Sequence, residues 1–370
     1  MIRSRSLLSI LVFVLLMTTA CMSTFSVQTT SPVNSTLASN LQSALDRALR
    51  QTDNPGATIA VMLPDQSIWA GASGIANLDQ RTAMQPESVF RIASVTKTFV
   101  ATLVMQLVEN NTLNLDDTLT EWLSPSLLNN IQFADQITIR QLLSHTSGIY
   151  DYLESDTFFD AIDRNPTRVW DDEDVLDFVD GNPYFSPGAS GQWEYSNTNY
   201  ILLGLIVESA TGNSLASELR SNIYQPLGLN DTYLETKENF PDTLVRGYES
   251  AGRRVEDVTD INTGNGLADG GILSTAADLA RFADGLFRGG LVSESTLQQM
   301  VNFHPIGEYG LGIASEFTTF GESFGHTGSI LGYTSIMWYF PEEDIIITAL
   351  VNLDFGDTDT LVEAVLDVVL

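Results

Sequence analysis

The chain has 370 residues, 44% of them hydrophobic and 17% charged, so it can bury one large core or two modest ones. That composition excludes a disordered chain. Its 17 basic and 47 acidic residues give a formal net charge of -30, and such a surface repels nucleic acid and anionic lipid, so we expect neither as a partner.

The first segment has the features of an export signal. Arg3 and Arg5 precede an apolar run over residues 7–17, and small residues at 18–20 offer a cleavage point. The apolar run is too short to span a bilayer. We therefore predict a signal peptide over residues 1–20 and an exported protein, periplasmic or extracellular.

Cys21, the only cysteine, directly follows that cleavage point. A lipid on Cys21 would explain its position, since a single cysteine cannot form an internal disulfide. Lipoprotein signals usually have leucine three residues earlier, where this chain has Thr18, so an ordinary cleaved signal is the alternative. Membrane anchoring is expected only through this lipid, and both interpretations stay open. Residues 21–36 are rich in Ser, Thr, Gln and Pro and predict a flexible tether.

Regular elements begin after the tether. Apolar residues at helical spacing predict a helix over residues 37–51. Two apolar runs around a Pro-Asp-Gln turn predict a hairpin of strands over 57–63 and 67–73. A strongly apolar helix is predicted over 95–108, and helices and polar loops dominate from there to about residue 300.

The end of the chain returns to strands. Apolar runs predict strands over 333–340 and 345–351 and a closing helix over 358–370, while Thr275 and Asp278 predict a capping box at an earlier helix. The simplest assembly is an α+β fold, in which an antiparallel sheet built from both chain ends is flanked by the terminal helices. A mostly helical subdomain is inserted, and a site is expected in the cleft between the two parts.

Ser94 and Lys97 lie one helical turn apart at the start of the apolar helix, and Lys97 is one of only two lysines. A helix N-terminus offers free N–H groups and a positive dipole end, which favour the oxyanion formed when a hydroxyl attacks a carbonyl. A lysine among apolar neighbours is either paired or shifted toward neutrality. Taken alone, a serine three residues before a lysine is more often an N-cap residue, and the lysine side chain is more often solvated.

Tyr195 and Asn197 form a second motif about a hundred residues later. A phenol can act as a base only near a cation, which Lys97 could supply. The amide of Asn197 can hold both Lys97 and a substrate carbonyl. The alternative is an aromatic loop packed on the core, with the asparagine in a turn.

His326, Thr327, Gly328 and Ser329 form the third motif. The N–H of Ser329 could stabilise an oxyanion together with the N–H of Ser94. Gly328 permits close approach of a substrate backbone, and His326 is expected to titrate near neutrality. The alternative is a structural histidine in a Gly-rich turn.

In order and spacing, these three motifs resemble those of the penicillin-recognising serine hydrolases, a family of D-alanyl-D-alanine peptidases, class C β-lactamases and related esterases. The likeness runs from about residue 40 to the C-terminus and includes the stretches 142–152, 270–275 and 309–312. It implies a β-lactamase/transpeptidase-like fold. The expected hydrolase domain covers 37–370, with a sheet part at 37–90 and 300–370 and a helical part at 91–299.

The resemblance also implies a role for each motif residue. Ser94 would be the acylated nucleophile, Lys97 its activating neighbour and Tyr195 the general base and acid. The residues alone leave open whether Lys97 or Tyr195 is the acylation base. The expected substrate contacts are Asn197, His326, Thr327, Gly328 and Ser329. No cofactor is implied.

The other polar candidates are weaker. His145 resembles a structural turn of the family, and His304 has no partner pattern. Because the three histidines are scattered and lack ligand spacing, no metal site is expected. The acidic run 171–174 predicts a solvated helix start.

The third motif is most similar to the D-alanyl-D-alanine carboxypeptidase branch, so such an enzyme acting on cell-wall peptide is the first expectation. In that branch an arginine after the Tyr-Gly-Leu-Gly stretch meets the substrate carboxylate, whereas residues 313–316 here are Ile-Ala-Ser-Glu. This departure favours the alternative, an esterase or class C-like β-lactamase on the same scaffold. A carboxylate could still be bound by the hydroxyls of Thr327 and Ser329, or by Arg253 or Arg254 approaching from another loop. A non-catalytic penicillin-binding module is a third interpretation. We expect a small peptide, ester or β-lactam substrate and a monomer.

Overall fold

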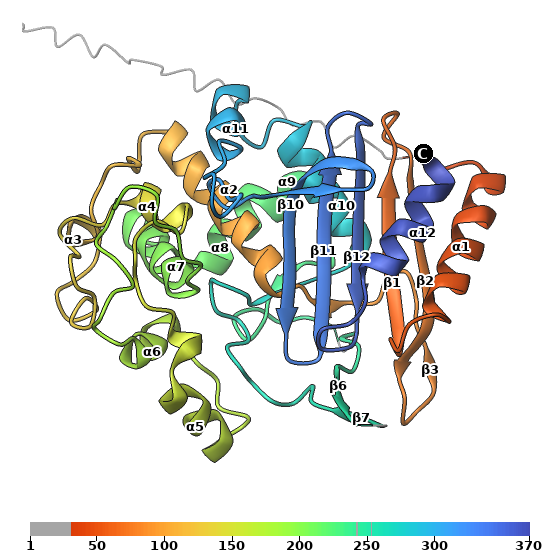
Figure 1. The fold of residues 1–370 in the computed structure, drawn as a ribbon, viewed down its shortest axis with the longest axis horizontal. Helices are drawn as coiled ribbons and strands as arrows, with labels where there is room; N and C mark the ends of the chain where they lie inside the picture. The colour runs from red at the N-terminus through yellow and green to blue at the C-terminus, as the bar shows by residue number, and fades with distance from the viewer. Residues whose placement is uncertain (1–30, 242, 253) are drawn as a thin grey trace, which may run out of the picture.

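A computed structural model of the chain describes residues 31–241, 243–252 and 254–370. The predicted signal peptide, Cys21 and most of the tether lie outside these residues. One half of the molecule is a seven-stranded antiparallel sheet, and helices gather beside it (Figure 1). From edge to edge, its strands are β3 (Thr82–Ala83), β2 (Ile68–Asn77), β1 (Gly56–Met62), β12 (Ile345–Val351), β11 (Tyr333–Phe340), β10 (Gly321–Ile330) and β9 (Ala314–Thr318).

The central strands β1 and β12 are buried on both faces, which explains why their sequences are continuous apolar runs. Alternate side chains of β12 enter two different cores: Ile345 and Ile347 join one, and Ile346 and Leu350 join the other. The sheet therefore separates two apolar layers.

Helices from the two ends of the described chain cover one face of this sheet. α1 (Ser35–Leu49) and α12 (Asp359–Val369) lie side by side there (Figure 1). α10 (Ala276–Phe287) packs on the other face against β1, β11 and β12. The predicted sheet made from both chain ends and flanked by the terminal helices is thus confirmed.

The capping box predicted at the start of α10 forms only in part. The Thr275 side chain accepts from the Asp278 N–H, as predicted. The Asp278 carboxylate, however, accepts from the Asp231 N–H and pairs with Arg281, so it is used in tertiary contacts.

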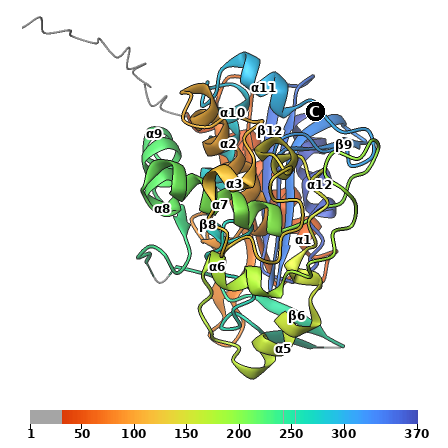
Figure 2. The ribbon, with the colours of Figure 1, turned by 90° about the vertical axis from the view of Figure 1, so that its left-hand side faces the viewer.

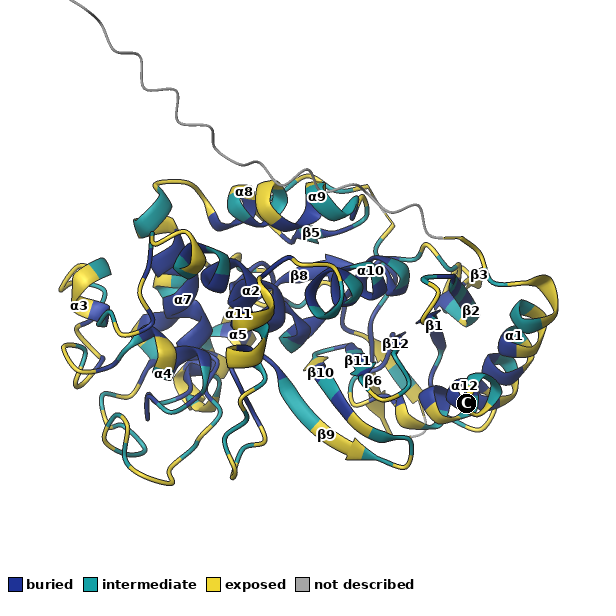
Figure 3. Cartoon of the chain, turned by 90° about the horizontal axis from the view of Figure 1, so that it is seen from above, coloured by how far each residue is buried: buried dark blue, intermediate teal, exposed yellow. Residues whose placement is uncertain are grey.

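Helices dominate the inserted region, which faces the viewer in Figure 2. They are α2 (Thr96–Glu109), α3 (Leu119–Trp122), α4 (Ile139–Leu143), α5 (Asp156–Arg164), α6 (Asp172–Val175), α7 (Thr198–Thr211), α8 (Leu215–Leu219), α9 (Gln225–Leu227) and α11 (Glu294–Met300). α2 and α7 form its buried centre, whereas α5 is largely exposed (Figure 3). Among the described residues, no helix is both long and apolar enough to cross a membrane.

Short strands interrupt this region, which the sequence did not predict. β4 (Phe90–Arg91), β8 (Ile272–Ser274) and β5 (Tyr233–Leu234) form a small sheet, and β6 (Tyr248–Ala251) pairs with β7 (Arg254–Asp257). β4 ends just before Ser94, so this small sheet holds the backbone that leads into the first motif.

The acidic run 171–174 begins α6, as predicted, with Asp171 and Asp174 forming a capping box. It is not solvated throughout. The Asp172 carboxylate accepts the Ala268 N–H at 3.0 Å, and burial raises the pKa of Asp172 to about 7.

Candidate active site

Ser94 lies in the 3-10 turn η1 (Ala93–Val95), and Lys97 lies in the first turn of α2. The two side chains meet: Lys97 Nζ is 3.1 Å from Ser94 Oγ. Ser94 is half-buried, whereas Lys97 has 0% exposure. The structure therefore brings the first motif together around a reachable hydroxyl and a fully buried amine.

The turn that carries Ser94 has a strained backbone. Ala93 has φ of 48°, in the left-handed region that residues with a Cβ rarely occupy. β10 packs directly against this turn, and a Cβ on Gly328 would overlap the carbonyl oxygen of Ile92. Ser335 on β11 also donates to that oxygen at 2.7 Å. Gly328 therefore has a structural role, close packing against the Ser94 turn, beside its predicted substrate contact.

Lys97 Nζ has three oxygen neighbours. It lies 2.7 Å from Asn197 Oδ1 and 2.6 Å from the carbonyl oxygen of Asp269, besides Ser94 Oγ. Two of these oxygens can only accept, so two N–H bonds of the amine are committed to them. The third position faces Ser94 and fits either an N–H of the ammonium or the lone pair of the neutral amine. This geometry allows a proton to pass between Ser94 and Lys97.

Asn197 is fixed at both ends of its amide. Its Oδ1 accepts from Lys97, and its Nδ2 donates to Asp151 Oδ2 at 2.7 Å. Because the amide is buried and oriented by the Lys97 amine on one side and a carboxylate on the other, it cannot rotate freely. Its second Nδ2 hydrogen can face a substrate, since Asn197 also lines the cleft described below.

Tyr195 lies beside this group but is not hydrogen-bonded to it. Its ring stacks on His145 with centroids 4.2 Å apart, and Lys97 Nζ is 5.1 Å from the Tyr195 ring centroid. The Tyr195 hydroxyl oxygen is buried and has no hydrogen-bond partner within the described part of the chain. The structure thus places the Tyr195 ring beside the Lys97 amine, without a hydrogen bond between the phenol oxygen and that amine.

His326 differs from its predicted behaviour. It is buried, its Nε2 is 2.9 Å from the Tyr309 hydroxyl, and its Nδ1 is 2.5 Å from the Thr327 carbonyl oxygen. Burial, together with the positive charge of Lys97, lowers the pKa of His326 to about 3. The expected titration near neutrality is therefore wrong: the imidazole stays neutral, donating from Nδ1 and accepting at Nε2.

The other members of the third motif point elsewhere. Thr327 and Ser329 are exposed and share one face of β10, opposite to His326. Ser329 lines the cleft in front of Ser94, and its Oγ donates to Asp354 at 3.3 Å. The third motif therefore presents Ser329 to a ligand and keeps His326 inside.

The cleft in front of Ser94 has a volume of about 490 Å³. Apolar side chains form most of its wall, and its ionisable groups are carboxylates. Its apolar and acidic lining includes Leu153, Phe159, Ile162, Asp163, Ile261, Asp269, Ile330, Leu331, Asp354 and Phe355. Among its described lining residues there is no arginine, lysine or histidine.

Comparison with known proteins agrees with this geometry. A profile of the family described as Beta-lactamase matches residues 41–369. The chain belongs to the Beta-lactamase family. The resemblance and fold expected from the motifs are thus confirmed.

Curated relatives of this Beta-lactamase family chain have several activities. It is 29% identical over 288 residues to a penicillin-binding protein of Bacillus subtilis, covering 71% of this chain and 60% of that protein. It is 35% identical over 204 residues to the esterase EstB of Burkholderia gladioli, covering 53% and 51%. It is 28% identical over 318 residues to a D-aminopeptidase of Brucella anthropi, covering 82% and 57%. The chain thus spans about half to three fifths of the length of these relatives.

Solved structures match more completely. A D-stereospecific amidohydrolase from Streptomyces has a TM-score of 0.76 at 30% identity, covering 88% of this chain and 98% of that one. D-amino acid amidase from Ochrobactrum anthropi, complexed with D-phenylalanine, has a TM-score of 0.76 at 29% identity, covering 90% and 99%. An octameric penicillin-binding protein homologue from Pyrococcus abyssi has a TM-score of 0.70 at 27% identity, covering 85% and 73%.

In this Beta-lactamase family member, several neighbours of the site escaped the sequence reasoning. Asp269 supplies a carbonyl oxygen to Lys97, while its buried carboxylate accepts from the Tyr152 hydroxyl at 2.9 Å. Burial raises the pKa of Asp269 to about 6, opposed by the Lys97 charge. Asp151 and Tyr152 lie in a stretch that the resemblance included, but nothing local showed their roles. Asp354 follows the last strand and had no sequence signal.

His145 has more contacts than a turn residue requires. Its Nδ1 accepts the Ser196 N–H at 3.1 Å, and its ring stacks on Tyr195. Burial and the Lys97 charge hold the pKa of His145 well below its ordinary value. It therefore supports the second motif as a neutral ring.

Arg254, one of the two arginines considered as carboxylate clamps, has no place in the site. Arg254 lies on β7, is exposed, and is not among the residues that line the cleft. Arg253 lies outside the described residues.

Proposed function

We propose that this chain is a serine acyl hydrolase that acts on esters or amides lacking a carboxylate near the scissile bond. The composition of the cleft supports this more than any other observation: Asp163, Asp269 and Asp354 line it, and its described lining offers no cation. A substrate carboxylate would meet this field without a cationic side chain in the described lining, which costs binding energy. The esterase alternative is thus favoured over the carboxypeptidase that the motifs suggested first.

In the proposed mechanism, Lys97 accepts the Ser94 proton while Ser94 Oγ bonds to the substrate carbonyl carbon. The 3.1 Å contact between Lys97 and Ser94 supports this assignment, as does the absence of a hydrogen bond from either residue to the Tyr195 oxygen. The N–H groups of Ser94 and Ser329 would stabilise the oxyanion. The proton then passes to the leaving group as its bond to carbon breaks. Water releases the acid from the acyl-enzyme by the reverse proton path and restores Ser94.

The names of the relatives also support this assignment. They include an esterase, a D-aminopeptidase, a D-stereospecific amidohydrolase and a D-amino acid amidase. A D-alanyl-D-alanine carboxypeptidase remains the second candidate, because a penicillin-binding protein is among the relatives as well.

Steady-state kinetics on matched donors would test the proposal. We expect the kcat/KM for a short-chain p-nitrophenyl ester to exceed that for a D-alanyl-D-alanine peptide, and the same peptide ending in an amide to be cleaved faster than its free acid. If the free acid were the better peptide, the carboxypeptidase would be the correct assignment.

The Ser94→Ala variant provides the control for this test. It should lose turnover of every donor while its melting temperature stays within a few degrees, because a half-buried hydroxyl contributes little to stability. Substantial activity in this variant would show that Ser94 is not the nucleophile.

Export and a monomeric state are further parts of this proposal, and a lipid on Cys21 is one of two alternatives for the mature N-terminus. Intact mass analysis of the mature protein would separate a free from a lipidated N-terminus. Light scattering would establish its oligomeric state, which matters because one structural relative is an octamer.

A further inference from the structure

Asp354 lies on the loop that follows β12, on the cleft wall that also contains Ser329. Its carboxylate accepts a side-chain hydrogen bond from Ser329 Oγ at 3.3 Å and keeps lone pairs for another donor. Ser329 is also the predicted oxyanion donor. A ligand group bound by Asp354 would therefore lie only a few atoms from the reacting carbonyl.

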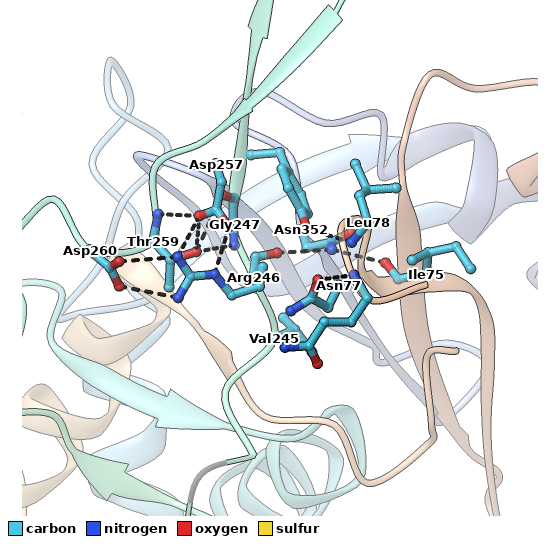
Figure 4. Close-up of polar contacts among 12 residues, drawn as sticks. Ile75, Asn77, Leu78, Val245, Arg246, Gly247, Asp257, Thr259, Asp260 and Asn352 are labelled. Atoms are coloured by element: carbon cyan, nitrogen blue, oxygen red, sulfur yellow. Dashed lines mark hydrogen bonds and ion pairs between the residues drawn. The ribbon is translucent and has the colours of Figure 1, made fainter. Parts of the chain in front are cut away.

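The loop that carries Asp354 is held rigidly. Asn352 at its start donates from Nδ2 to the carbonyl oxygens of Ile75 at 3.1 Å and Arg246 at 3.0 Å (Figure 4). The Asp354 N–H donates to the Tyr248 carbonyl oxygen at 2.8 Å. These bonds tie the loop to two separate segments, one containing Ile75 and the other containing Arg246 and Tyr248, so the position of the Asp354 carboxylate is fixed before a ligand binds.

The far end of the loop is tied down as well. The Gly356 N–H donates to Thr334 Oγ1 at 2.8 Å. Asp357 and Asn54 exchange two hydrogen bonds, of 2.7 Å and 3.0 Å. Asn352, Asp354 and Gly356 are thus all bonded to other segments, and this arrangement suits a loop that presents a side chain at a defined place.

The residue after Asp354 is an aromatic exposed at the cleft. Phe355 is 84% exposed and lines the cleft, and its φ of 49° is a costly conformation for a residue with a Cβ. Phe159, 48% exposed, contributes a second ring to the same lining. Two exposed rings in one cleft lining, one of them on a strained backbone, motivate a binding role for this wall.

We propose that Asp354 and Phe355 form a recognition site for an ammonium group on the substrate, so that the enzyme prefers amine-bearing acyl donors. This inference rests on the proposed hydrolase function. A carboxylate beside an aromatic ring is the combination that binds an ammonium with an adjoining apolar group, through an ion pair and a cation–π contact. Asp163, in the same lining, adds negative potential. The same charges repel a donor that carries a carboxylate.

The kinetic test compares phenylalanine amide, in both enantiomers, with 3-phenylpropionamide, which lacks only the ammonium. The native enzyme should prefer the better enantiomer of the amine by tenfold or more, and Asp354→Asn should reduce this preference by about tenfold. Asn keeps the shape and an acceptor for Ser329, so the variant changes mainly the charge.

Asp135→Asn is the matched control. Asp135 is exposed, does not line this cleft, and its loss changes the net charge equally. It should leave the preference for the amine unchanged. An equal drop in both variants would mean that overall charge, and not Asp354, sets the preference, and no drop in Asp354→Asn would overturn the proposal.

A binding measurement separates this inference from the proposed chemistry. In the Ser94→Ala background, benzylammonium should bind more tightly than benzyl alcohol by calorimetry, and adding Asp354→Asn should remove the difference. Binding that persists after Asp354→Asn would overturn the ammonium site even if hydrolysis were established. Conversely, Asp354-dependent binding in a protein without hydrolytic activity would support the site and refute the proposed function.

Discussion

Lys97 is the residue on which the proposed chemistry depends, because its three oxygen neighbours include the nucleophile. We predict that Lys97→Met lowers kcat/KM by about a thousandfold, the usual range for losing a general base. Tyr195→Phe should cost less than about tenfold, since its oxygen bonds to neither Lys97 nor Ser94. Pre-steady-state acylation rates would measure both. If Tyr195→Phe were the more damaging change, the phenol and not the amine would be the base.

Asp269 predicts a pH dependence of stability. Its folded-state pKa of about 6 lies above the ordinary value of 3.8, so the native state binds more protons than the unfolded state between these limits. The contribution of Asp269 to stability therefore falls as pH rises through this window. Asp269→Asn should stabilise the protein by up to about 3 kcal/mol at pH 8 and by less than about 1 kcal/mol at pH 4.

Chemical denaturation at both pH values would measure this difference. The amide can still accept from the Tyr152 hydroxyl, so the variant removes the buried charge and keeps the hydrogen bond. Equal stabilisation at pH 4 and pH 8 would contradict the assignment of the raised pKa to Asp269.

Contacts within one turn or between the recognised motifs were predictable, as the 2.7 Å contact of Lys97 with Asn197 shows, whereas long-range contacts outside the motifs were not. Ser94 and Lys97 sit within one turn, so their spacing alone placed them on one helix face. The carbonyl oxygen that Asp269 gives to Lys97 comes from 172 positions away, and such a contact has no local pattern. The titration of His326 was misjudged for the same reason, because its burial and the nearby Lys97 charge arise only in the folded state.

At the scale of elements, the contact between β10 and the Ser94 turn positions the nucleophile. Gly328→Ala would push a methyl group into the Ile92 carbonyl, so we predict a loss of about 2 kcal/mol or more together with a large loss of activity. Thermal melts and ester hydrolysis would measure both effects. Glu322→Ala, an exposed change on the same strand, should alter neither by much. A fully active and stable Gly328→Ala variant would show that β10 has room for a methyl group beside the Ile92 carbonyl oxygen.

Strand prediction succeeded where a buried strand required a long apolar run in the sequence. β11 and β12 begin and end at the predicted residues, because both are long apolar runs separated by a polar turn. β4, β5 and β8 escaped notice because they have two or three residues each and pair only across distant segments. A strand of two or three residues is too short to show the alternation of apolar and polar residues that identifies a strand in a sequence.

At the scale of the whole molecule, the sheet joins the two ends of the described chain, so stability depends on residues far from the chemistry. α12 buries Leu361, Val365 and Leu366 against the sheet face opposite α10. We predict that removing residues 359–370 abolishes soluble expression or activity, although no site residue is lost. Removing only Leu370, which is 55% exposed, should shift the melting temperature by no more than a few degrees. An active enzyme without α12 would show that the sheet is stable with this face uncovered.

The left-handed backbone at Ala93 has an evolutionary consequence. Glycine there would relieve the steric penalty of about 1–2 kcal/mol in the folded state. It would also raise the conformational entropy of the unfolded chain, which lowers stability by a similar amount. Substitution of Ala93 by glycine would then leave the melting temperature almost unchanged, while the Ser94 hydroxyl would be held less firmly in its orientation. Selection could detect such a change only through turnover, so alanine at this position would be a mark of catalysis and not of thermal resistance.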